Sequence, residues 1–486
     1  MQTQSFDWKS LISGTDLRGG ALGEGAVLTP ERAAVIGAGF GAWIRSMYPN
    51  ADRPTIAVGR DSRLSGESLS RSLRTGISSA GARVLDLGLS TTPAMFEATQ
   101  HEKTKATAAV MVTASHLPAN RNGFKFILQT GGLESSQLNE LVEFIKRQPF
   151  TDSNGSDEAF DFLPLYTRKL TDFVSSRLSE DAPLSGLKVV VDASNGSGGF
   201  YERWLASLGA DTTGSIFLEP DGRFLGHAPN PEDKSAILAL SNAVLSQRAD
   251  IGVIFDADCD RAALVASDGS PLSRERLICL CADLLSRDKP GATIVTDSVT
   301  SPALTHYINS RGLSHRRFKR GYKNVISEAL RLNAAGMSCP LAMETSGHAA
   351  FRENRFLDDG MYLATLVIIE AVRAKRSGED IVDRLSDLRM PVEELEKRIP
   401  VADAGDRKLA LSNLTAWLNT KGADKYILFP NEAEGVRAET KSGDGWLLLR
   451  SSLHDPLIVL NAEGYAEGSV NDMLLDIEDA TKIKLL

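Results

Sequence analysis

Three stretches of the chain repeat one order of hydrophobic and polar positions. Each has a short apolar run, a polar loop, an amphipathic segment, a glycine and a second apolar run. The first runs lie at 55–58, 187–191 and 293–296, the segments end near 80, 208 and 310, and the second runs lie at 83–87, 213–217 and 314–318. The alternation predicts strand, helix and strand in each repeat, and therefore three related α/β domains with mixed or parallel sheets.

A glycine follows the amphipathic segment in each repeat, at Gly81, Gly209 and Gly312. Because glycine readily takes the left-handed conformation that ends a helix, we expect each helix to stop there. Gly37, Gly39 and Gly41 resemble part of a dinucleotide-binding fingerprint, but that fingerprint must follow a strand. Thr29 and Pro30 are instead typical of a helix start, so we predict a helix with small packing residues.

The C-terminal part follows a different pattern. Apolar runs at 446–449 and 457–460 precede an amphipathic segment around 470–480, which predicts a smaller α+β domain. Polar stretches typical of linkers lie at 151–158, 268–273 and near 393–398. We therefore expect four domains, with the bounds 1–152, 153–272, 273–388 and 389–486.

Composition narrows the class of protein. A length of 486 residues suggests about three domains and allows four. The net charge of −9 argues against a general nucleic-acid binder. Four cysteines (259, 279, 281 and 339) form neither a zinc spacing nor a secreted disulfide framework, which indicates a reducing compartment.

The sequence shows no pattern typical of secretion or of membrane insertion. The N-terminus has no basic region followed by an apolar core, and no run reaches the ~18 apolar residues of a membrane-spanning helix. We expect a soluble, cytoplasmic enzyme, monomeric or homodimeric, without membrane or nucleic-acid partners. The plastid stroma is the alternative location if a transit segment has been removed.

Three alternating carboxylates follow the apolar run 251–255, at Asp256, Asp258 and Asp260. In an extended backbone alternate side chains share a side, so all three are expected to converge. Mg²⁺ would relieve their repulsion, because it takes oxygen ligands and leaves positions open for water or phosphate. Arg261 adds a forked donor suited to a phosphate or a carboxylate.

The spacing of the aspartates also allows two other interpretations. An EF-hand loop requires glycine where Arg261 stands and glutamate where Ser267 stands, so it is excluded. A solvated acidic turn remains the simpler alternative, although the preceding apolar strand and Arg261 favour a site.

A second polar stretch, Thr113-Ala-Ser115-His116-Leu-Pro118, follows the apolar run 108–112. Ser115 is a candidate nucleophile at a strand end, but it lacks the glycines of a nucleophile elbow. His116 and Lys125 are candidate proton shuttles. A serine-histidine pair is by itself more often a turn with helix-capping roles.

The ordered set of motifs resembles the α-D-phosphohexomutase family over nearly the whole chain. Its serine loop, metal loop and sugar loop correspond to 113–118, 256–261 and Glu344-Thr-Ser346-Gly-His348. Supporting matches are Asn122-Gly-Phe-Lys125, Gly14-Thr-Asp-Leu-Arg18-Gly, His227-Ala-Pro-Asn-Pro231, Gly321-Tyr-Lys323 and Asp359-Gly360. The resemblance implies four domains around a central cleft, which carry in turn the phosphoserine, metal-binding, sugar-binding and phosphate-binding loops.

The resemblance also implies roles for single residues. Ser115 would carry the transferable phosphate and, with the three aspartates, hold one Mg²⁺. Proton transfer and charge stabilisation would fall to His116, Lys125, Arg18 and Arg261. Sugar and phosphate binding would fall to Lys323, Glu344, Ser346, His348, Arg437, Arg450, Ser452 and His454.

The implied activity is interconversion of hexose 1- and 6-phosphates, with glucose as the expected sugar. It would pass through a phosphoserine and a hexose 1,6-bisphosphate, which also serves as activator. In the family's phosphate loop, an amide or glycine and a threonine stand where this chain has Leu453 and His454. In the family's serine loop, an asparagine stands where this chain has Leu117. A second hypothesis is therefore a glucose-1,6-bisphosphate synthase that takes phosphate from a donor such as fructose 1,6-bisphosphate. A third is a sugar-phosphate sensor without turnover.

Overall fold

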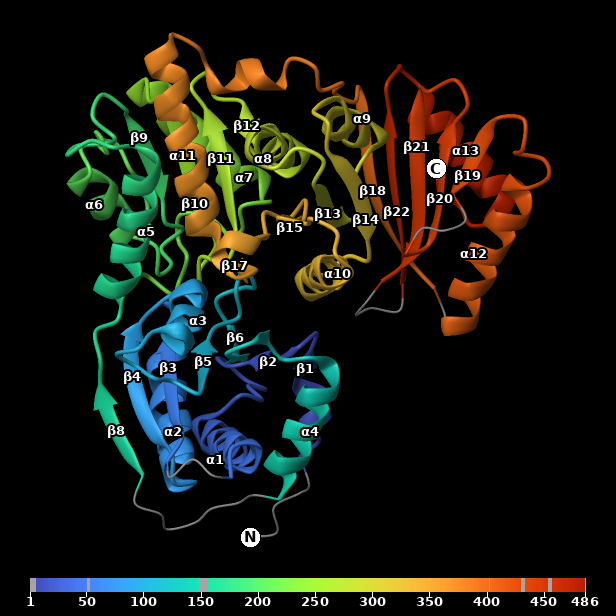
Figure 1. Cartoon of the computed structure of the whole chain (residues 1–486). Helices are drawn as coiled ribbons and strands as arrows, with labels where there is room; N and C mark the ends of the chain where they lie inside the picture. Colours follow the sequence, from blue (N-terminus) through green and yellow to red (C-terminus); the bar gives the residue numbers. More distant parts are fainter. Residues whose placement is uncertain are drawn as a thin grey trace. The chain divides into compact units, whose positions relative to one another are not determined.

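The computed structural model describes residues 6–49, 53–147, 155–401, 403–429, 433–452 and 457–485. The chain forms two compact units (Figure 1). Unit 1 comprises Met1–Ser273, Ser346–Ala349 and Leu357–Ile381, and unit 2 comprises Arg274–Thr345, Ala350–Phe356 and Val382–Leu486. Three α/β/α domains and a fourth domain with an antiparallel sheet confirm the predicted fold class.

The first sheet of unit 1 is mixed, with the order β1-β2-β6-β5-β3-β4-β8, and β7 pairs with β6. Its central strand β5 runs parallel to β3 and antiparallel to β6. The strands are β1 (Ile12–Ser13), β2 (Asp16–Gly20), β3 (Thr55–Arg60), β4 (Arg83–Leu89), β5 (Ala108–Val112), β6 (Arg121–Leu128), β7 (Gly131–Gly132) and β8 (Ser156–Ala159). The helices are η1 (Trp8–Leu11), α1 (Pro30–Met47), α2 (Gly66–Ser79), α3 (Thr92–Gln100) and α4 (Ser135–Lys146).

Helix α1 carries the three glycines that resembled a nucleotide-binding fingerprint. The Thr29 side chain caps it by accepting a hydrogen bond from Arg32 N, and Pro30 lies in its first turn. A Cβ on Gly37 would lie 2.1 Å from the carbonyl oxygen of Leu73 in α2, and one on Gly39 would lie 2.6 Å from Ile145 in α4. The glycines therefore let neighbouring helices approach, which confirms the predicted packing helix.

The second sheet of unit 1 has the order β12-β11-β10-β9, in which β10 is parallel to β9 and antiparallel to β11. Its strands are β9 (Val189–Asp192), β10 (Ile251–Phe255), β11 (Ala262–Ala266) and β12 (Pro271–Leu272). The helices in this part of unit 1 are α5 (Leu163–Arg177), α6 (Phe200–Ser207), α7 (Lys234–Gln247) and α11 (Gly360–Ser377).

The prediction of a strand at 213–217 is wrong. Within this segment Ile216 makes an isolated bridge to Asp192, and Asp211, just before it, makes another to Lys188. Gly214 has φ +95° and Phe217 has φ +49°, and these turns prevent a continuous hydrogen-bonded ladder. The predicted helix stops are confirmed, because Gly81, Gly209 and Gly312 have φ values of +86°, +97° and +71°.

The first sheet of unit 2 includes β13 (Thr293–Asp297), which is parallel to both β14 (Ser314–Phe318) and β15 (Leu341–Met343). Helices α8 (Arg274–Asp288), α9 (Pro302–Ser310) and α10 (Tyr322–Ala334) belong to the same part of the chain. The short elements that follow are β16 (Ala349–Phe351), η2 (Arg352–Asn354), β17 (Leu357–Asp358) and η3 (Ile381–Leu385).

The second sheet of unit 2 is antiparallel, with the order β18-β22-β21-β20-β19. Its strands are β18 (Glu393–Pro400), β19 (Tyr426–Phe429), β20 (Val436–Thr440), β21 (Gly445–Ser451) and β22 (Leu457–Gly464). Helices α12 (Ala404–Leu418) and α13 (Ser469–Thr481) share a hydrophobic core with it. This arrangement confirms the smaller α+β domain.

The predicted linker near 393–398 is wrong, because this charged stretch forms strand β18. It pairs with β22 from Glu393–Gly464 to Pro400–Leu457. Burial alternates along it, with Leu395 and Ile399 less exposed than their neighbours, so it shows the period of two of a half-buried strand. The other two polar stretches also contribute short strands, β8 and β12, while residues 151–154 lie outside the described part.

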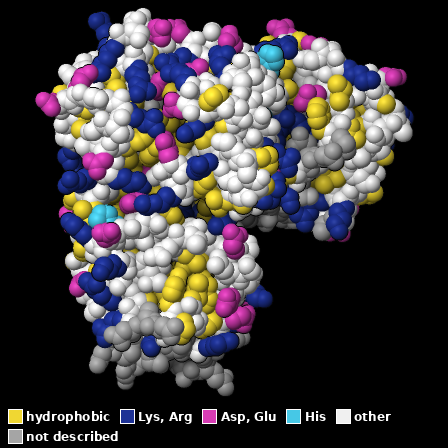
Figure 2. Space-filling view, viewed as in Figure 1, with side chains coloured by type: hydrophobic (Ala, Val, Ile, Leu, Met, Phe, Trp, Pro, Cys, Tyr) yellow, Lys and Arg dark blue, Asp and Glu magenta, His cyan; other side chains and the backbone are white. Residues whose placement is uncertain are grey.

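Charged side chains of both signs are mixed over the visible face of the molecule (Figure 2). Among the described residues, every helix is too short or too polar to cross a membrane.

Candidate functional site

Ser115 follows the fully buried strand β5 and lies in a tight loop. Its φ is +53°, a left-handed conformation that residues other than glycine rarely adopt. Ser115 Oγ donates to Asp256 Oδ2 at 2.8 Å, accepts from Arg261 Nη2 at 3.2 Å and lies 3.3 Å from His116 Nδ1. Only 4% of the residue is exposed. The structure therefore places Ser115, His116 and the metal loop, which were predicted separately, next to one another in unit 1.

The three aspartates converge as predicted, but for a different reason. Residues 256–260 form turns after β10 rather than an extended strand, and Cys259 takes φ +62°. One carboxylate oxygen from each aspartate lies within 4.8 Å of the others. A tight loop, not strand alternation, gathers Asp256, Asp258 and Asp260 on one side.

Positive and polar groups surround these carboxylates. Lys125 Nζ donates to Asp258 Oδ2 at 2.9 Å and to Asp260 Oδ2 at 2.5 Å. Lys125 of β6 pairs with Met111 of β5, and this register of the two strands positions its ammonium group at the metal loop. Thr92, which was not predicted, donates its hydroxyl to Asp258 Oδ2 at 2.5 Å and its backbone N–H to Asp258 O at 2.9 Å.

The buried charges shift the ionisation of their neighbours. Burial, together with the charges of Asp260 and Asp258, raises the pKa of Asp256 well above its usual value. Burial also acts to raise the pKa of Asp260, but the cations, led by Lys125, outweigh it and hold that pKa below its usual value. Burial and the nearby Arg261 and Arg18 lower the pKa of His116 to about 2, so its ring is neutral at neutral pH.

This donor set fits a Mg²⁺ ion. Mg²⁺ takes oxygen ligands, and the three carboxylates offer them from one loop. Asp258 Oδ1 and Asp260 Oδ1 are buried and have no hydrogen-bond partner among the described residues. Buried carboxylate oxygens without partners are costly, and a divalent cation would satisfy them.

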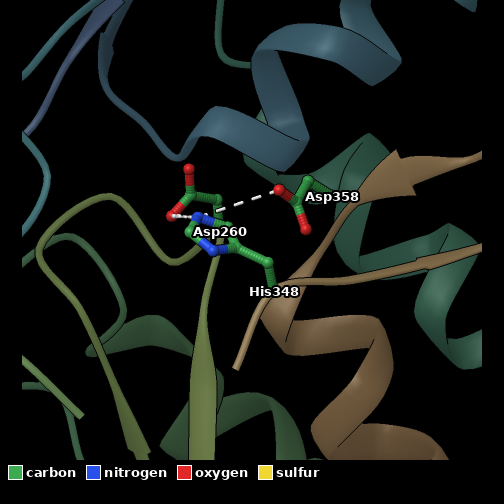
Figure 3. A group of neighbouring side chains, drawn as sticks. All are labelled: Asp260, His348 and Asp358. Carbon is green, nitrogen blue, oxygen red and sulfur yellow. Dashed lines mark ion pairs between the residues drawn. The ribbon is translucent and has the colours of Figure 1, made fainter. Parts of the chain in front are cut away.

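A second group adjoins the metal loop, with His348 between two carboxylates (Figure 3). His348 Nε2 lies 3.8 Å from Asp260 Oδ1 and 3.8 Å from Asp358 Oδ2. Its Nδ1 lies 2.9 Å from Ser346 Oγ, so this hydrogen bond orients the ring. Ser346 and His348 of the sugar-loop prediction thus belong to unit 1, and Asp358 joins them although sequence reasoning missed it.

The backbone of the metal loop lies close to two glycines of the matched motifs. A Cβ on Gly347 would lie 2.4 Å from Ala262 O, and one on Gly360 would lie 2.5 Å from the carbonyl carbon of Arg261. Asp359 caps helix α11 by accepting from Tyr362 N and also accepts from the Tyr166 hydroxyl at 2.8 Å. The Asp359-Gly360 motif therefore supports the loop that carries Arg261.

Arg18 lies on β2, and its guanidinium pairs with Asp16 at 2.7 Å. Its Nη1 also donates to Ala114 O at 3.4 Å, next to Ser115. Burial acts to lower the pKa of Arg18, but the charge and hydrogen bonds of Asp16, with smaller contributions from Asp258 and Asp260, raise it above its usual value. Arg18 therefore adds positive charge beside the serine loop, where sequence analysis expected it.

Unit 2 contains the remaining predicted residues. Glu344 is buried, and its Oε1 accepts from Gly321 N at 2.6 Å, just before helix α10. Asp297, at the end of β13, accepts from Thr345 Oγ1 at 2.9 Å and from Thr345 N at 3.4 Å. Burial and the charge of Glu344 raise the pKa of Asp297 to about 7. Lys323 is partly exposed in the first turn of α10.

Arginines and carboxylates gather where the two sheets of unit 2 contribute loops. Glu434 Oε2 accepts from Ser298 Oγ at 2.7 Å and from Arg320 N at 3.0 Å, and Glu434 Oε1 lies 3.7 Å from Arg450 Nη1. Arg450 is only 5% exposed, and its Nε has no hydrogen-bond partner among the described residues. Burial and the charge of Arg320 lower the pKa of Arg450. Such a guanidinium is suited to bind an anion.

Three other predicted phosphate-binding residues have different environments. Arg437 is fully buried, lies 4.3 Å from the Trp446 ring centroid and donates to Ser298 O at 3.3 Å. Ser452 is partly exposed, and its backbone N–H donates to Leu457 O at 2.9 Å. His454 lies outside the described residues, as does Leu453.

Four of the residues that sequence analysis missed share one signal. Asp61, Arg63, Asp297 and Arg320 are charged residues at or just after the ends of parallel strands, the edge where such sheets commonly bind ligands. Thr92 and Glu434 carried no comparable signal, because both act through partners distant in sequence.

Comparison with known proteins gives one consistent result. Models of the phosphoglucomutase/phosphomannomutase α/β/α domains I, II and III match residues 10–152, 164–269 and 273–388. A phosphomannomutase/phosphoglucomutase of Pseudomonas syringae pv. tomato is 32% identical over 449 residues, covering 91% of this chain and 89% of that protein. A phosphoglucomutase of Neisseria gonorrhoeae is 30% identical over 467 residues, covering 95% and 94%.

A solved structure agrees over the full length. The crystal structure of a phosphoglucomutase/phosphomannomutase family protein from Burkholderia thailandensis matches with a TM-score of 0.81 and 28% sequence identity. The match covers 98% of this chain and 99% of that one. The similarity therefore includes the C-terminal antiparallel domain, beyond the three matched family domains.

Proposed function

The chain belongs to the phosphoglucomutase/phosphomannomutase family, and we propose that it is a Mg²⁺-dependent phosphohexomutase acting on glucose phosphates. It would interconvert hexose 1-phosphate and hexose 6-phosphate through phospho-Ser115 and a hexose 1,6-bisphosphate. The observation that carries this proposal is the position of Ser115 Oγ, 2.8 Å from Asp256 Oδ2 and 3.2 Å from Arg261 Nη2. A phosphate on this oxygen would meet the metal-loop carboxylates and a buried guanidinium.

In the first transfer, the bond between phosphorus and Ser115 Oγ breaks and a bond to a sugar hydroxyl oxygen forms. The sugar hydroxyl loses its proton, and Ser115 Oγ regains one when the serine is released. His116 Nδ1 lies 3.3 Å from Ser115 Oγ, so we assign proton transfer to it. Reversal on the other phosphate of the bisphosphate returns a phosphoryl group to Ser115.

Charge neutralisation is the larger contribution, because phosphoryl transfer depends mainly on positioning and electrostatics. Asp256, Asp258 and Asp260 would hold Mg²⁺, which supplies positive charge to the phosphoryl oxygens when bound. Lys125 and Arg261 hold the carboxylates in place and add further positive charge. Arg18 lies beside the same loop and is assigned the same role.

Substrate binding is assigned from the remaining residues. In unit 2, Arg450 and Arg320 offer guanidinium groups for the phosphate that is not transferred, with Ser452, Lys323 and His454 as further donors. Glu344 would accept from sugar hydroxyls, as would Ser346 and His348 of unit 1. Arg437 is fully buried, so we assign it support of the Ser298 loop rather than direct phosphate contact.

A second candidate function is glucose-1,6-bisphosphate synthesis. The observation that favours it is Leu453-His454 in place of the polar residues of the family's phosphate loop. Weaker anchoring of one phosphate would let the bisphosphate leave before the second transfer. A different donor, such as fructose 1,6-bisphosphate, would then recharge Ser115.

One experiment separates these functions. The purified protein is incubated with glucose 1-phosphate, Mg²⁺ and excess fructose 1,6-bisphosphate, and products are followed by ³¹P NMR. We expect rapid formation of glucose 6-phosphate with only trace bisphosphate. Stoichiometric glucose 1,6-bisphosphate would instead establish the synthase.

The serine is tested in the same assay. Ser115→Ala should abolish either activity, because no oxygen remains to accept the phosphoryl group. Retained turnover in this variant would rule out both functions. Binding of glucose phosphates by the wild-type protein without any phosphate transfer would support a sensor.

A further inference from the structure

Arg63 is a buried arginine outside all the matched motifs, and it donates to four backbone carbonyl oxygens in and just after the serine loop. Its side chain, in the loop between β3 and α2, is fully buried. Nη2 donates to the carbonyl oxygens of Ser115 at 2.5 Å and Leu117 at 2.7 Å. Nη1 donates to the carbonyl oxygens of Pro118 at 2.8 Å and Arg121 at 3.0 Å. One guanidinium therefore organises the backbone from 115 to 121.

Asp61 connects the same arginine to the other side of Ser115. Arg63 Nε donates to Asp61 Oδ2 at 3.1 Å, and Thr113 Oγ1 donates to the same oxygen at 2.7 Å. Thr113 Oγ1 in turn accepts from Ser115 N at 2.8 Å. Both backbone polar groups of Ser115 are thus tied to the Asp61–Arg63 ion pair.

Ser115 needs such support because its backbone is strained. A serine at φ +53° is held in a sparsely populated region, and such conformations persist only where the surroundings fix them. The loop carbonyl oxygens also carry partial negative charge, which would repel a phosphate on Ser115 if they turned toward it. Their hydrogen bonds to Arg63 keep four of them directed at a cation.

We infer that Asp61, Arg63 and Thr113 form a clamp that positions Ser115 for phosphoryl transfer. The inference rests on the proposed function, since it concerns the serine that carries the phosphate. Asp61 and Arg63 bond to backbone atoms and to Thr113 rather than to Ser115 Oγ, so they are positioning residues. Because transfer depends on alignment, loosening the clamp lowers kcat and has little effect on the KM for glucose 1-phosphate.

Thr113 supplies the sharpest test, because two substitutions separate its hydroxyl from its shape. Thr113→Val keeps the shape but loses the oxygen that links Ser115 N to Asp61, while Thr113→Ser keeps that oxygen. We expect kcat to fall at least about tenfold in Thr113→Val and to stay within about twofold of wild type in Thr113→Ser. The KM for glucose 1-phosphate should change by less than about twofold in both, since neither substitution touches the sugar-phosphate residues.

Arg63→Lys tests the other arm of the clamp. A lysine ammonium has three donors on one atom and cannot reproduce the planar fork that reaches four carbonyl oxygens. We expect a loss of about 100-fold in kcat, the size of effect that small misplacements of reacting groups produce. Arg71→Gln is the matched control: that side chain is 70% exposed and pairs only with Glu67 among the described residues, so kcat should not change.

Hydrogen–deuterium exchange of the peptide that contains 113–121 gives a readout independent of turnover. In the metal-free protein, Thr113→Val and Arg63→Lys should exchange this peptide faster, and Thr113→Ser and Arg71→Gln should match wild type. Unchanged kcat in Thr113→Val would overturn the inference, as would unchanged exchange of the loop with a general loss of melting temperature. If wild type turns over no sugar phosphate, the proposed function fails, and the exchange data still decide whether the clamp holds the loop.

Discussion

At the scale of single residues, the buried carboxylates of the metal loop are only partly paired with positive or donor groups. Asp258 has no exposed surface, yet it is one of three carboxylates in a single loop. Lys125 and Thr92 bond to one of its oxygens, and the other has no hydrogen-bond partner among the described residues. Such an arrangement trades stability of the metal-free loop for affinity toward a cation.

Asp258→Asn should affect activity more than stability. The amide keeps the shape and removes one of three repelling charges, so the loss of attraction to Lys125 is partly offset. We expect half-maximal activity to require at least about tenfold more Mg²⁺, because one anionic ligand is lost. Mg²⁺ titration of turnover and thermal melting in EDTA measure the two effects. A large drop in melting temperature with normal Mg²⁺ dependence would contradict this account.

Asp297 should make the stability of unit 2 depend on pH. Its pKa rises from 3.8 to about 7 on folding, so between these values the folded chain holds a proton that the unfolded chain has lost. Stability from this group is therefore greatest at low pH, falls as pH rises through this window and is constant above about 7. At about 1.4 kcal/mol per pKa unit, the fall is on the order of 4 kcal/mol at most.

Asp297→Asn should remove this part of the pH dependence. Urea unfolding of the variant and wild type between pH 4.5 and 8 gives the difference, in which titrating groups that do not interact with Asp297 cancel. Asp387→Asn is a suitable control, since the Asp387 side chain is 63% exposed. A constant difference between Asp297→Asn and wild type across this range would exclude the raised pKa.

At the scale of elements, close backbone approaches determine how helices pack around the functional loops. Helices α1 and α2 meet through Gly37 and Gly76, where a Cβ would lie 2.1 Å and 2.0 Å from carbonyl oxygens of the facing helix. Helix α2 begins directly after the loop that carries Arg63. Packing between these helices therefore helps to hold the segment that binds the serine loop.

Gly37→Ala tests this packing, because two effects of opposite sign compete. Alanine gains up to about 1 kcal/mol of helix propensity over glycine. A Cβ at 2.1 Å from Leu73 O forces α1 and α2 apart, and such overpacking costs roughly 1–3 kcal/mol or more. We expect net destabilisation, measured by chemical denaturation. Gly20→Ala should be nearly neutral, as its Cβ would meet nothing within 4 Å.

At the scale of the whole molecule, the two units contain different parts of the proposed chemistry. Unit 1 holds Ser115, the three aspartates and His348, and unit 2 holds Glu344, Arg320 and Arg450. The sugar-loop motif 344–348 itself passes from unit 2 into unit 1 at residue 346. Ligands that bind one set of residues should therefore stabilise one unit selectively.

Mg²⁺ should protect unit 1 and leave unit 2 unchanged. A saturating ligand at 100 times its Kd adds about 2.7 kcal/mol to the state that binds it. We expect slower hydrogen–deuterium exchange around 256–261 on addition of Mg²⁺, and no change around 434–452. Ca²⁺, which prefers larger coordination numbers, serves as the comparison cation. Equal protection of both segments would show that the units respond as one body.

Much of the fold could be predicted from local sequence patterns, and the two wrong predictions of secondary structure have local causes. The runs before Ser115 and Asp256 are strands β5 and β10, because continuous apolar stretches bury both faces. The prediction of a strand at 213–217 is wrong because two residues there adopt left-handed conformations, which a pattern of apolar residues does not reveal. The charges of 393–398 predict a linker, because they mask the period of two that the strand shows in its burial.

The sequence by itself determined most of the elements, the family and the chemical groups that the chain brings to its site. Ser115, the three aspartates and Lys125 are recognisable because each stands in a short motif next to an apolar strand. These motifs also indicate which side-chain atoms are available to bind phosphate and metal. Local order along the chain is enough for these conclusions, because strand ends and loops are local features.

Only the tertiary structure decided what holds these groups in place. Thr92 reaches Asp258 across 166 positions, and Ser298 reaches Glu434 across 136. Arg63 reaches the serine loop across 52 or more positions. The physical reason is that a buried charge needs hydrogen-bond or ionic partners. The folded backbone, rather than spacing along the chain, determines which residues lie close enough to serve as those partners.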